Sequence, residues 1–117
     1  MHLEAFRKHC LSFPGVTETV QWGSDLVFKV GGKMFAVSAT EPAKVCRAFK
    51  CDPENFAELT ERPGIIPAPY LARAQWVALE TETALPAGEL KLLLRQAYDL
   101  VVAKLPKKAQ AELGKAR

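Results

Sequence analysis

Residues 25–38 read DLVFKVGGKMFAVS, and this stretch decides the fold that we predict from the sequence. Gly31 and Gly32 lie between two runs of apolar residues. A two-residue turn of type I′ needs positive φ at both central positions, and glycine adopts positive φ at little cost. The stretch therefore predicts an antiparallel hairpin whose tip is Gly31-Gly32.

The position of the turn sets the expected register of this hairpin. Counting outward from the glycines gives three pairs, Val30–Lys33, Phe28–Phe35 and Leu26–Val37. Side chains alternate between the two faces of a strand. The face expected to meet the core therefore carries Leu26, Phe28, Phe35 and Val37. The other face carries Val27, Lys29, Met34, Ala36 and Ser38, a mixture typical of an antiparallel sheet covered on one side only.

The segments before residue 62 predict a helix, two more strands and a second helix. Apolar residues at three- and four-residue steps predict a helix over residues 2–13, and β-branched residues predict a strand over residues 17–22. A strand over residues 44–50 is expected to turn Val45 and Phe49 toward the core, which places Arg47 at an edge or extends its charge to water. Asp52 and Pro53 are typical of the first positions of a helix.

The rest of the chain predicts a loop, a strand and a long helix. Three prolines and one glycine, at positions 63, 64, 67 and 69, indicate an irregular loop over residues 63–75. A strand over residues 75–80 is expected to follow it. Pro86 precedes a helix over about residues 87–105 with an apolar stripe, and one more short helix is expected over residues 107–113.

Together these elements predict an α+β domain. The expected architecture is an antiparallel sheet of about five strands with the N- and C-terminal helices packed on one face. The chain of 117 residues has the length of one domain. We expect a core over about residues 2–105 and a basic C-terminal extension over residues 106–117.

The formal net charge of +3 conceals two basic segments. Residues 29–50 carry a net charge of +4 and residues 104–117 carry another +4, whereas residues 51–103 carry −4. Positive charge on a strand pair favours binding to phosphates, because each neutralised phosphate releases condensed counterions. The alternative is that these lysines keep the face and edges of the sheet soluble. The candidate nucleic-acid-binding residues are Lys29, Lys33, Lys44, Arg47, Lys50, Arg73, Lys107 and Lys108.

Other function classes lack support in the sequence. The scattered thiols Cys10, Cys46 and Cys51 and the isolated histidines form no metal-ligand spacing, and no phosphate-binding glycine motif is present. We therefore predict no metal, no cofactor and no catalytic residues. No apolar run is long enough to span a membrane and no signal peptide is recognisable, so we expect a cytoplasmic protein. The oligomeric state is left open, with a monomer as one alternative.

Six segments in order resemble the MmcQ/YjbR family. They are FPGVTE (13–18), LVFKVGGKMFA (26–36), KCDPE (50–54), PGIIP (63–67) leading to Trp76, AYDLVVA (97–103) and LPKK (105–108). The resemblance covers roughly residues 11–108. It implies a fold similar to the bacterial frataxin CyaY and a "double-wing" DNA-binding module of bacteria. It brings no catalytic residues, and Lys29, Lys33 and Lys50 match its basic positions.

One segment departs from this family pattern. Many relatives carry a basic stretch with histidine or asparagine before the tryptophan, whereas residues 71–76 read LARAQW, with Arg73 as the only charge. The frataxin-like fold also raises iron binding, but the first predicted helix sets Glu4 against Arg7 and Lys8, which disfavours it. Fold alone does not establish function.

Three function hypotheses follow. The first is non-enzymatic DNA binding through the basic sheet face and hairpin. The second is a small-molecule or protein-interaction module with no nucleic-acid role, in which Tyr70 and Trp76 line a groove beside the proline-rich loop; Trp76 in the core is the simpler alternative. The third is an enzyme that uses Cys51 with a histidine brought to it by folding.

Overall fold

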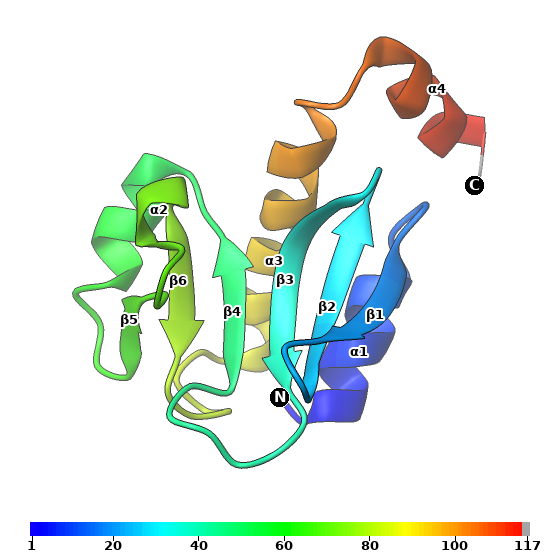
Figure 1. Ribbon diagram of the computed structural model, residues 1–117. Coiled ribbons are helices and arrows are strands. Elements are labelled where there is room, and N and C mark those ends of the chain that lie inside the picture. Colours follow the sequence, from blue (N-terminus) through cyan, green and yellow to red (C-terminus); the bar gives the residue numbers. More distant parts are fainter. Residues whose placement is uncertain (116–117) are drawn as a thin grey trace.

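The computed structural model describes residues 1–115, which form an α+β fold around a six-stranded antiparallel sheet (Figure 1). The strands are β1 (Thr17–Gln21), β2 (Asp25–Val30), β3 (Lys33–Ala39), β4 (Arg47–Lys50), β5 (Ile65–Pro67) and β6 (Trp76–Leu79). Their order across the sheet is β1-β2-β3-β4-β6-β5. The predicted fold class is confirmed, with one strand more than expected.

Helices α1 and α3 cover one face of this sheet and leave the other face open (Figure 1). The helices are α1 (Leu3–Leu11), α2 (Pro53–Leu59), α3 (Ala87–Val102) and α4 (Lys107–Lys115), with a short 3-10 helix, η1 (Ala72–Ala74). We call the side of the sheet away from α1 and α3 the open face. The main core lies on the helical side, where buried residues of α1 and α3 pack against the strands.

The hairpin tip is confirmed, but its register is wrong beyond the first pair. Gly31 and Gly32 have φ of 60° and 79°, and Val30 pairs with Lys33 as expected. Lys29 then pairs with Met34, whereas Phe28 pairs with Ala36. Phe35 is therefore an extra residue in β3, which is a β-bulge.

The bulge changes which face several residues occupy. Because Phe35 is inserted, both Phe35 and Ala36 pack in the main core, and Val37 turns to the open face. The expected faces of Ala36, Val37 and Ser38 are thereby exchanged, and Ser38 is fully buried. The open face is consequently more apolar than predicted, with a second buried cluster of Val27, Val37, Ala68, Trp76 and Ala78.

Strand β4 begins later than expected and is not at an edge. It lies between β3 and β6, so Arg47 occupies an interior position of the sheet and is 4% exposed. The expectation that Arg47 lies at an edge or extends its charge to water is wrong. Val45 precedes the strand and packs against the open-face cluster and not in the main core, whereas Phe49 is in the main core as predicted.

The proline-rich segment contains the strand that the sequence did not predict. Residues Ile65–Pro67 form β5, which pairs with β6 at the edge of the sheet. Proline is tolerated at an edge because its missing N–H need not join the ladder. Trp76 is 3% exposed, so the simpler alternative of a core tryptophan is confirmed.

Particular contacts fix three of the helices, α2, α3 and α4. Asp52 caps α2 by accepting a hydrogen bond of 2.7 Å from the Asn55 amide. Tyr98 of α3 is buried, and its hydroxyl donates a 2.6 Å hydrogen bond to the Pro14 carbonyl. Leu113 of α4 fills the space that a Cβ at Gly15 would occupy, so α4 lies against the domain.

Candidate functional site

The open face carries a groove with a volume of about 490 Å³. Its floor is made by small and branched side chains of the central strands, and its sides come from two turns far apart in sequence. The lining residues are Trp22, Asp25, Val37, Val45, Ala48, Ala68, Pro69, Tyr70, Leu71 and Ala78. This is the concave aromatic surface that the second hypothesis required, although Tyr70 provides it with Trp22 and not with Trp76.

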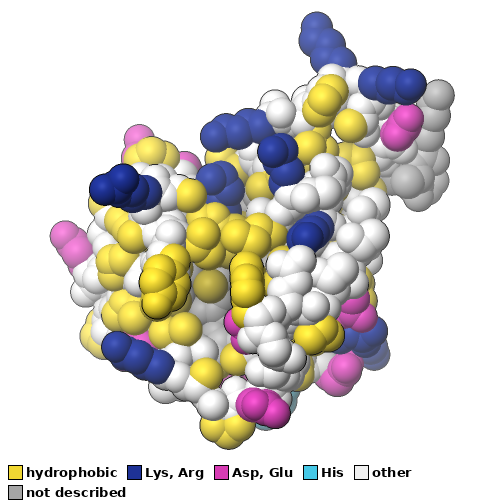
Figure 2. Space-filling view, in the orientation of Figure 1, with side chains coloured by type: hydrophobic (Ala, Val, Ile, Leu, Met, Phe, Trp, Pro, Cys, Tyr) yellow, Lys and Arg dark blue, Asp and Glu magenta, His cyan; other side chains and the backbone are white. Residues whose placement is uncertain are grey.

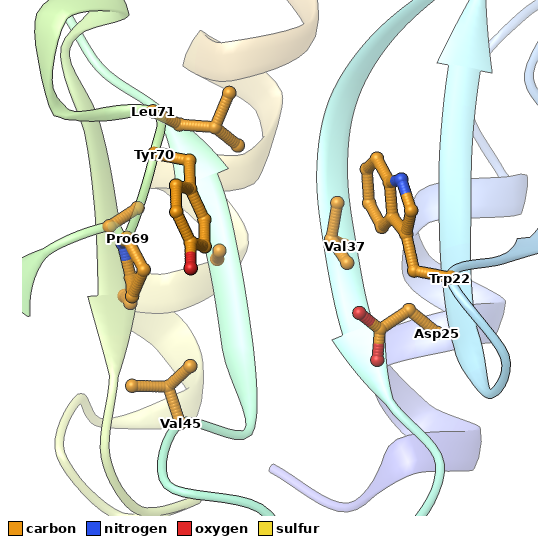
Figure 3. A pocket seen from close by; sticks show the side chains of 10 residues that line it. Trp22, Asp25, Val37, Val45, Pro69, Tyr70 and Leu71 are labelled. Atoms are coloured by element: carbon orange, nitrogen blue, oxygen red, sulfur yellow. The ribbon is translucent and has the colours of Figure 1, made fainter.

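Trp22 and Tyr70 stand on opposite sides of this groove (Figure 3). Both are exposed large apolar side chains, Trp22 at 63% and Tyr70 fully. Both also have positive φ, 53° and 66° respectively, which is uncommon for bulky residues and costs on the order of 1–3 kcal/mol. Burial of these two rings therefore does not explain their positions.

The turn that presents Trp22 is tied to the neighbouring strand. The Thr40 hydroxyl, just beyond β3, donates a hydrogen bond to the carbonyl of Ser24 in that turn. On the other side of the groove, the Leu71 amide donates a hydrogen bond to the Ala68 carbonyl, and the Ala68 amide donates one to the backbone carbonyl of Trp76. These bonds fix the chain on either side of Tyr70. Both aromatic residues thus project from anchored backbone.

A second, smaller hollow of about 210 Å³ adjoins the groove at Leu71. Three lysines from separate parts of the chain line it together with five apolar residues. We call it the lysine hollow; it consists of Lys33, Met34, Lys50, Leu71, Ala74, Trp76, Val101 and Lys104. Figure 2 shows basic side chains gathered toward the hairpin end of this face, beside the apolar depression. Lys104, the first residue of the C-terminal basic segment, therefore meets Lys33 and Lys50 of the other basic segment, whereas residues 116–117 lie outside the described part of the chain.

The lysine hollow perturbs Lys50 in particular. Burial lowers the pKa of the Lys50 ammonium, and the charge of Lys104 lowers it further. The ammonium donates a 3.0 Å hydrogen bond to the Ala74 carbonyl, which holds it beside the hollow. An anion placed there would offset the repulsion between the two lysines.

Contact between the two chain segments explains why these lysines converge. Leu105, just after α3, packs so closely over the hairpin tip that a Cβ at Gly31 would lie 2.7 Å from its side chain. This contact places Lys104 beside the hairpin. It also places Lys107 and Lys108, which begin α4 and are exposed, at the same end of the sheet.

Two other predicted residues flank this region. Lys29 pairs across the strands with Met34, which lines the lysine hollow, and its side chain is half-buried on the open face. Arg73 is exposed in η1, between the hollow residues Leu71 and Ala74.

Lys44 and Arg47 do not join this cluster. Lys44 lies in the loop between β3 and β4, at the opposite end of the sheet from Lys33. Arg47 turns to the helical side, where its guanidinium lies 5.2 Å from the Phe6 ring centroid and forms a 3.0 Å salt bridge with Glu82. Its charge is therefore already neutralised inside the protein, and we remove Arg47 from the candidate site.

The lysines differ from most arginines in charge pairing, and this holds for Lys8, Lys44 and Lys91 as well as for the clustered lysines. Arg7, Arg47, Arg62 and Arg95 each form a salt bridge with a carboxylate. In the part of the chain that the structure describes, no salt bridge involves Lys29, Lys33, Lys50 or Lys104. The hairpin end of the sheet, where Lys33, Lys50 and Lys104 converge, thus holds positive charge that no salt bridge among the described residues neutralises.

The cysteine hypothesis finds no support in the geometry. Cys51 is 4% exposed, and burial, with a smaller effect of the Asp52 charge, raises its pKa to about 12. A nucleophilic thiol instead needs a lowered pKa and access to substrate. His9 lies on α1, with its ring nitrogen 3.1 Å from the Lys91 carbonyl, and His2 lies 3.8 Å from Glu82.

Residues 1–115 show neither a metal-binding cluster nor a membrane-spanning helix. These residues contain no group of three or more His, Cys, Asp or Glu side chains arranged to hold a metal ion. None of their helices combines the length and the apolar character that crossing a membrane requires.

Sequence reasoning missed Trp22, Asp25 and Lys104 as candidate site residues. The sequence pattern places Trp22 at the end of one strand and Asp25 at the start of the next. The tryptophan beside Gly23 was the available signal for an exposed turn. Lys104 lay within the basic C-terminal segment, but only the packing of Leu105 on Gly31 brings it to the hairpin.

Comparisons with known proteins place the chain among a set of similar sequences and structures. A family model described as YjbR matches residues 11–100. No match was found among curated proteins. The crystal structure of Deinococcus radiodurans protein DR2400, with a domain described as DUF419, is 33% identical over 96% of this chain and 87% of that chain, with a TM-score of 0.83. A Pseudomonas syringae protein has 23% identity, coverage of 86% and 98%, and a TM-score of 0.71, a likeness of fold.

Proposed function

The chain belongs to the YjbR family, and we propose that it is a non-enzymatic DNA-binding protein that contacts phosphates through the open face of its sheet. The observation that carries this proposal is the lysine hollow, where Lys33, Lys50 and Lys104 converge from three segments. Like charges repel, so a folded protein gathers them without carboxylate partners at a cost that a bound anion removes.

The proposed contact surface extends from the hollow along the hairpin. Lys29 and Arg73 flank it, and Lys107 and Lys108 add charge at the hairpin end. The hairpin supplies the wing-like projection that the family resemblance implies, because a β-ribbon fits into a nucleic-acid groove. Lys44 is retained only as a distant contributor to the overall field.

A duplex titration at two salt concentrations tests this function. With about four to six phosphate contacts, affinity should be weak and should fall steeply with salt. Charge reversal of Lys33 and Lys50 (K33E/K50E) should abolish binding, whereas reversal of Lys8 and Lys91, exposed on the helical side, should reduce it much less. Binding that ignores salt, or that survives K33E/K50E, contradicts the proposal.

The groove favours a second candidate function, binding of a small apolar molecule or peptide segment with no nucleic-acid role. Its lining is mostly apolar, and ligand pockets typically combine an apolar wall with few polar groups. If neither duplex nor single-stranded DNA binds at low salt, this second function is the better account.

A further inference from the structure

We propose that the groove between Trp22 and Tyr70 binds the bases of single-stranded DNA while the adjoining lysine hollow holds its phosphates. This inference rests on the proposed function and names the form of DNA that the open face takes. It assigns a role to two aromatic residues that neither the family resemblance nor the charge pattern indicated.

The groove combines exposed aromatic rings with an apolar floor. Every base offers a flat π-face, and stacking on aromatic side chains is the usual way in which proteins bind single strands without sequence preference. Trp22 and Tyr70 are exposed on opposite sides of the groove, so each can take a base (Figure 3). The floor between them contains Val37, Ala48 and Ala78, which leave room for a planar group.

The apolar groove and the lysine hollow are contiguous. Leu71 lines both the groove and the lysine hollow. A single strand presents phosphates along one side and unstacked bases along the other, which matches a basic surface beside an aromatic one. A duplex buries its base faces in the stack and cannot use Trp22 or Tyr70 in this way.

Among the described residues, Asp25 is the one acidic residue that lines the groove. Asp25 begins β2 and therefore lies at the end of the sheet away from the hairpin. Lys33 begins β3 and lies at the opposite end, beside the hairpin tip. The carboxylate of Asp25 repels phosphate from the end away from the hairpin and can accept hydrogen bonds from the exocyclic amines of bases. The groove is thus polarised, with phosphate favoured at the lysine end and base edges at the Asp25 end.

The backbone of the two aromatic residues fits this role. Trp22 and Tyr70 hold positive φ while exposing their rings to water, so the strain is not offset by burial. Strained backbone persists where the surrounding structure holds it, often at ligand-binding positions. Thr40 provides such support for the turn of Trp22 through its bond to Ser24.

The test compares a mixed-sequence strand of about ten nucleotides with the duplex of the same length, using the full chain. Fluorescence anisotropy gives affinity, and tryptophan emission reports stacking, because Trp22 is exposed whereas Trp76 is buried. We expect tighter binding of the single strand, quenching of Trp22, and about tenfold weaker binding after Trp22→Ala or Tyr70→Ala. Trp22→Phe should restore most of the affinity.

One control variant and measurements with duplex DNA and adenosine monophosphate separate the possible outcomes. Leu92→Ala removes from α3 an apolar side chain whose exposure, 68%, is close to the 63% of Trp22, and it should leave affinity unchanged. Duplex binding that equals or exceeds single-strand binding, with no effect of Trp22→Ala or Tyr70→Ala, overturns this inference but leaves the proposed function standing. Binding of neither DNA overturns both. Equal affinity for adenosine monophosphate would assign the groove to free nucleotides and would also overturn the inference.

Discussion

Lys50 and Lys104 line the same hollow although they lie on a central strand and just beyond the end of α3. Burial is the main cause that lowers the pKa of Lys50, and the charge of Lys104 is the next. This pairing of like charges across 54 positions of sequence is the feature on which the proposed function depends.

The coupling between these two lysines can be measured directly. Lys104→Gln removes the like charge, so the pKa of Lys50 should rise toward its ordinary value while burial still holds it below. NMR titration of the Lys50 side chain between pH 8 and 11 follows this change. Lys91→Gln, on the helical side, is the control and should leave the titration of Lys50 unchanged. An identical Lys50 titration in wild type and Lys104→Gln would show that the two charges do not interact.

Alanine substitutions at the two glycines of the hairpin tip should lower the free energy of unfolding by different amounts. Gly32→Ala meets no neighbouring atom within 4 Å but forces positive φ on a residue with a Cβ, which costs about 1–2 kcal/mol. Gly31→Ala adds a close contact with the buried Leu105, so it should cost about 1–3 kcal/mol more. Urea denaturation gives both free energies of unfolding. Equal losses would mean that Leu105 does not pack on the hairpin as described.

Arg47 should matter for stability and not for DNA binding. Its guanidinium is buried whereas the carboxylate of Glu82 is 45% exposed, so water can solvate Glu82 but not Arg47. Glu82→Ala, which leaves a buried charge without its carboxylate, should therefore destabilise the protein by about 2–3 kcal/mol, less than the roughly 3–5 kcal/mol expected for a fully buried pair because Glu82 is partly exposed. Arg47→Met, which removes the charge, should cost at least about 1 kcal/mol less.

The DNA affinity of the Arg47→Met variant tests whether Arg47 takes part in DNA binding. Because Arg47 lies on the helical side and is already paired, its loss should change affinity less than twofold in the titration used for Lys33 and Lys50. A loss as large as that of a hollow lysine would return Arg47 to the binding site.

Alkaline pH should destabilise the fold through its buried thiols. Burial raises the pKa of Cys10 and of Cys51 to about 12, whereas thiols in an unfolded chain titrate near about pH 8.5. The folded-state pKa is the higher one, so this contribution is fully present below about pH 8.5 and is lost as pH rises toward 12. Urea denaturation at pH 8 and pH 10 should show a smaller decrease for Cys10→Ala than for wild type. An unchanged decrease would contradict the burial of the thiol.

The hydrophobic pattern predicted most elements because it agreed with local signals. The glycine pair, the Asp52 cap and the stripe of α3 each coincided with an apolar period, so local and tertiary preferences favoured the same structure. The bulge at Phe35 had no such signal. Apolar residues follow one another in β3, so nothing in their order shows where strict alternation fails.

The remaining misses depend on tertiary contacts. Pro67 made residues 65–67 resemble a loop, and only an edge position beside β6 makes a strand acceptable there. Splitting the charge along the chain did identify the segments that form the basic surface. Which lysines meet within it depends on how far α3 runs and on where Leu105 packs. Alternation placed Arg47 on the same face as Phe49, but only the position of β4 between β3 and β6 and the salt bridge to Glu82 show that its charge is buried and paired.

The salt dependence of DNA binding by two charge-matched variants tests the central claim most directly. Lys50→Gln/Lys104→Gln and Lys8→Gln/Lys91→Gln each remove two positive charges, but only the first pair lies in the hollow. Each lost phosphate contact reduces the slope of log affinity against log salt by about 0.9 on duplex DNA and about 0.7 on a single strand. The account predicts a slope reduced by about 2 on duplex, or about 1.4 on a single strand, for Lys50→Gln/Lys104→Gln and an unchanged slope for Lys8→Gln/Lys91→Gln. Equal slopes for the two variants would contradict it.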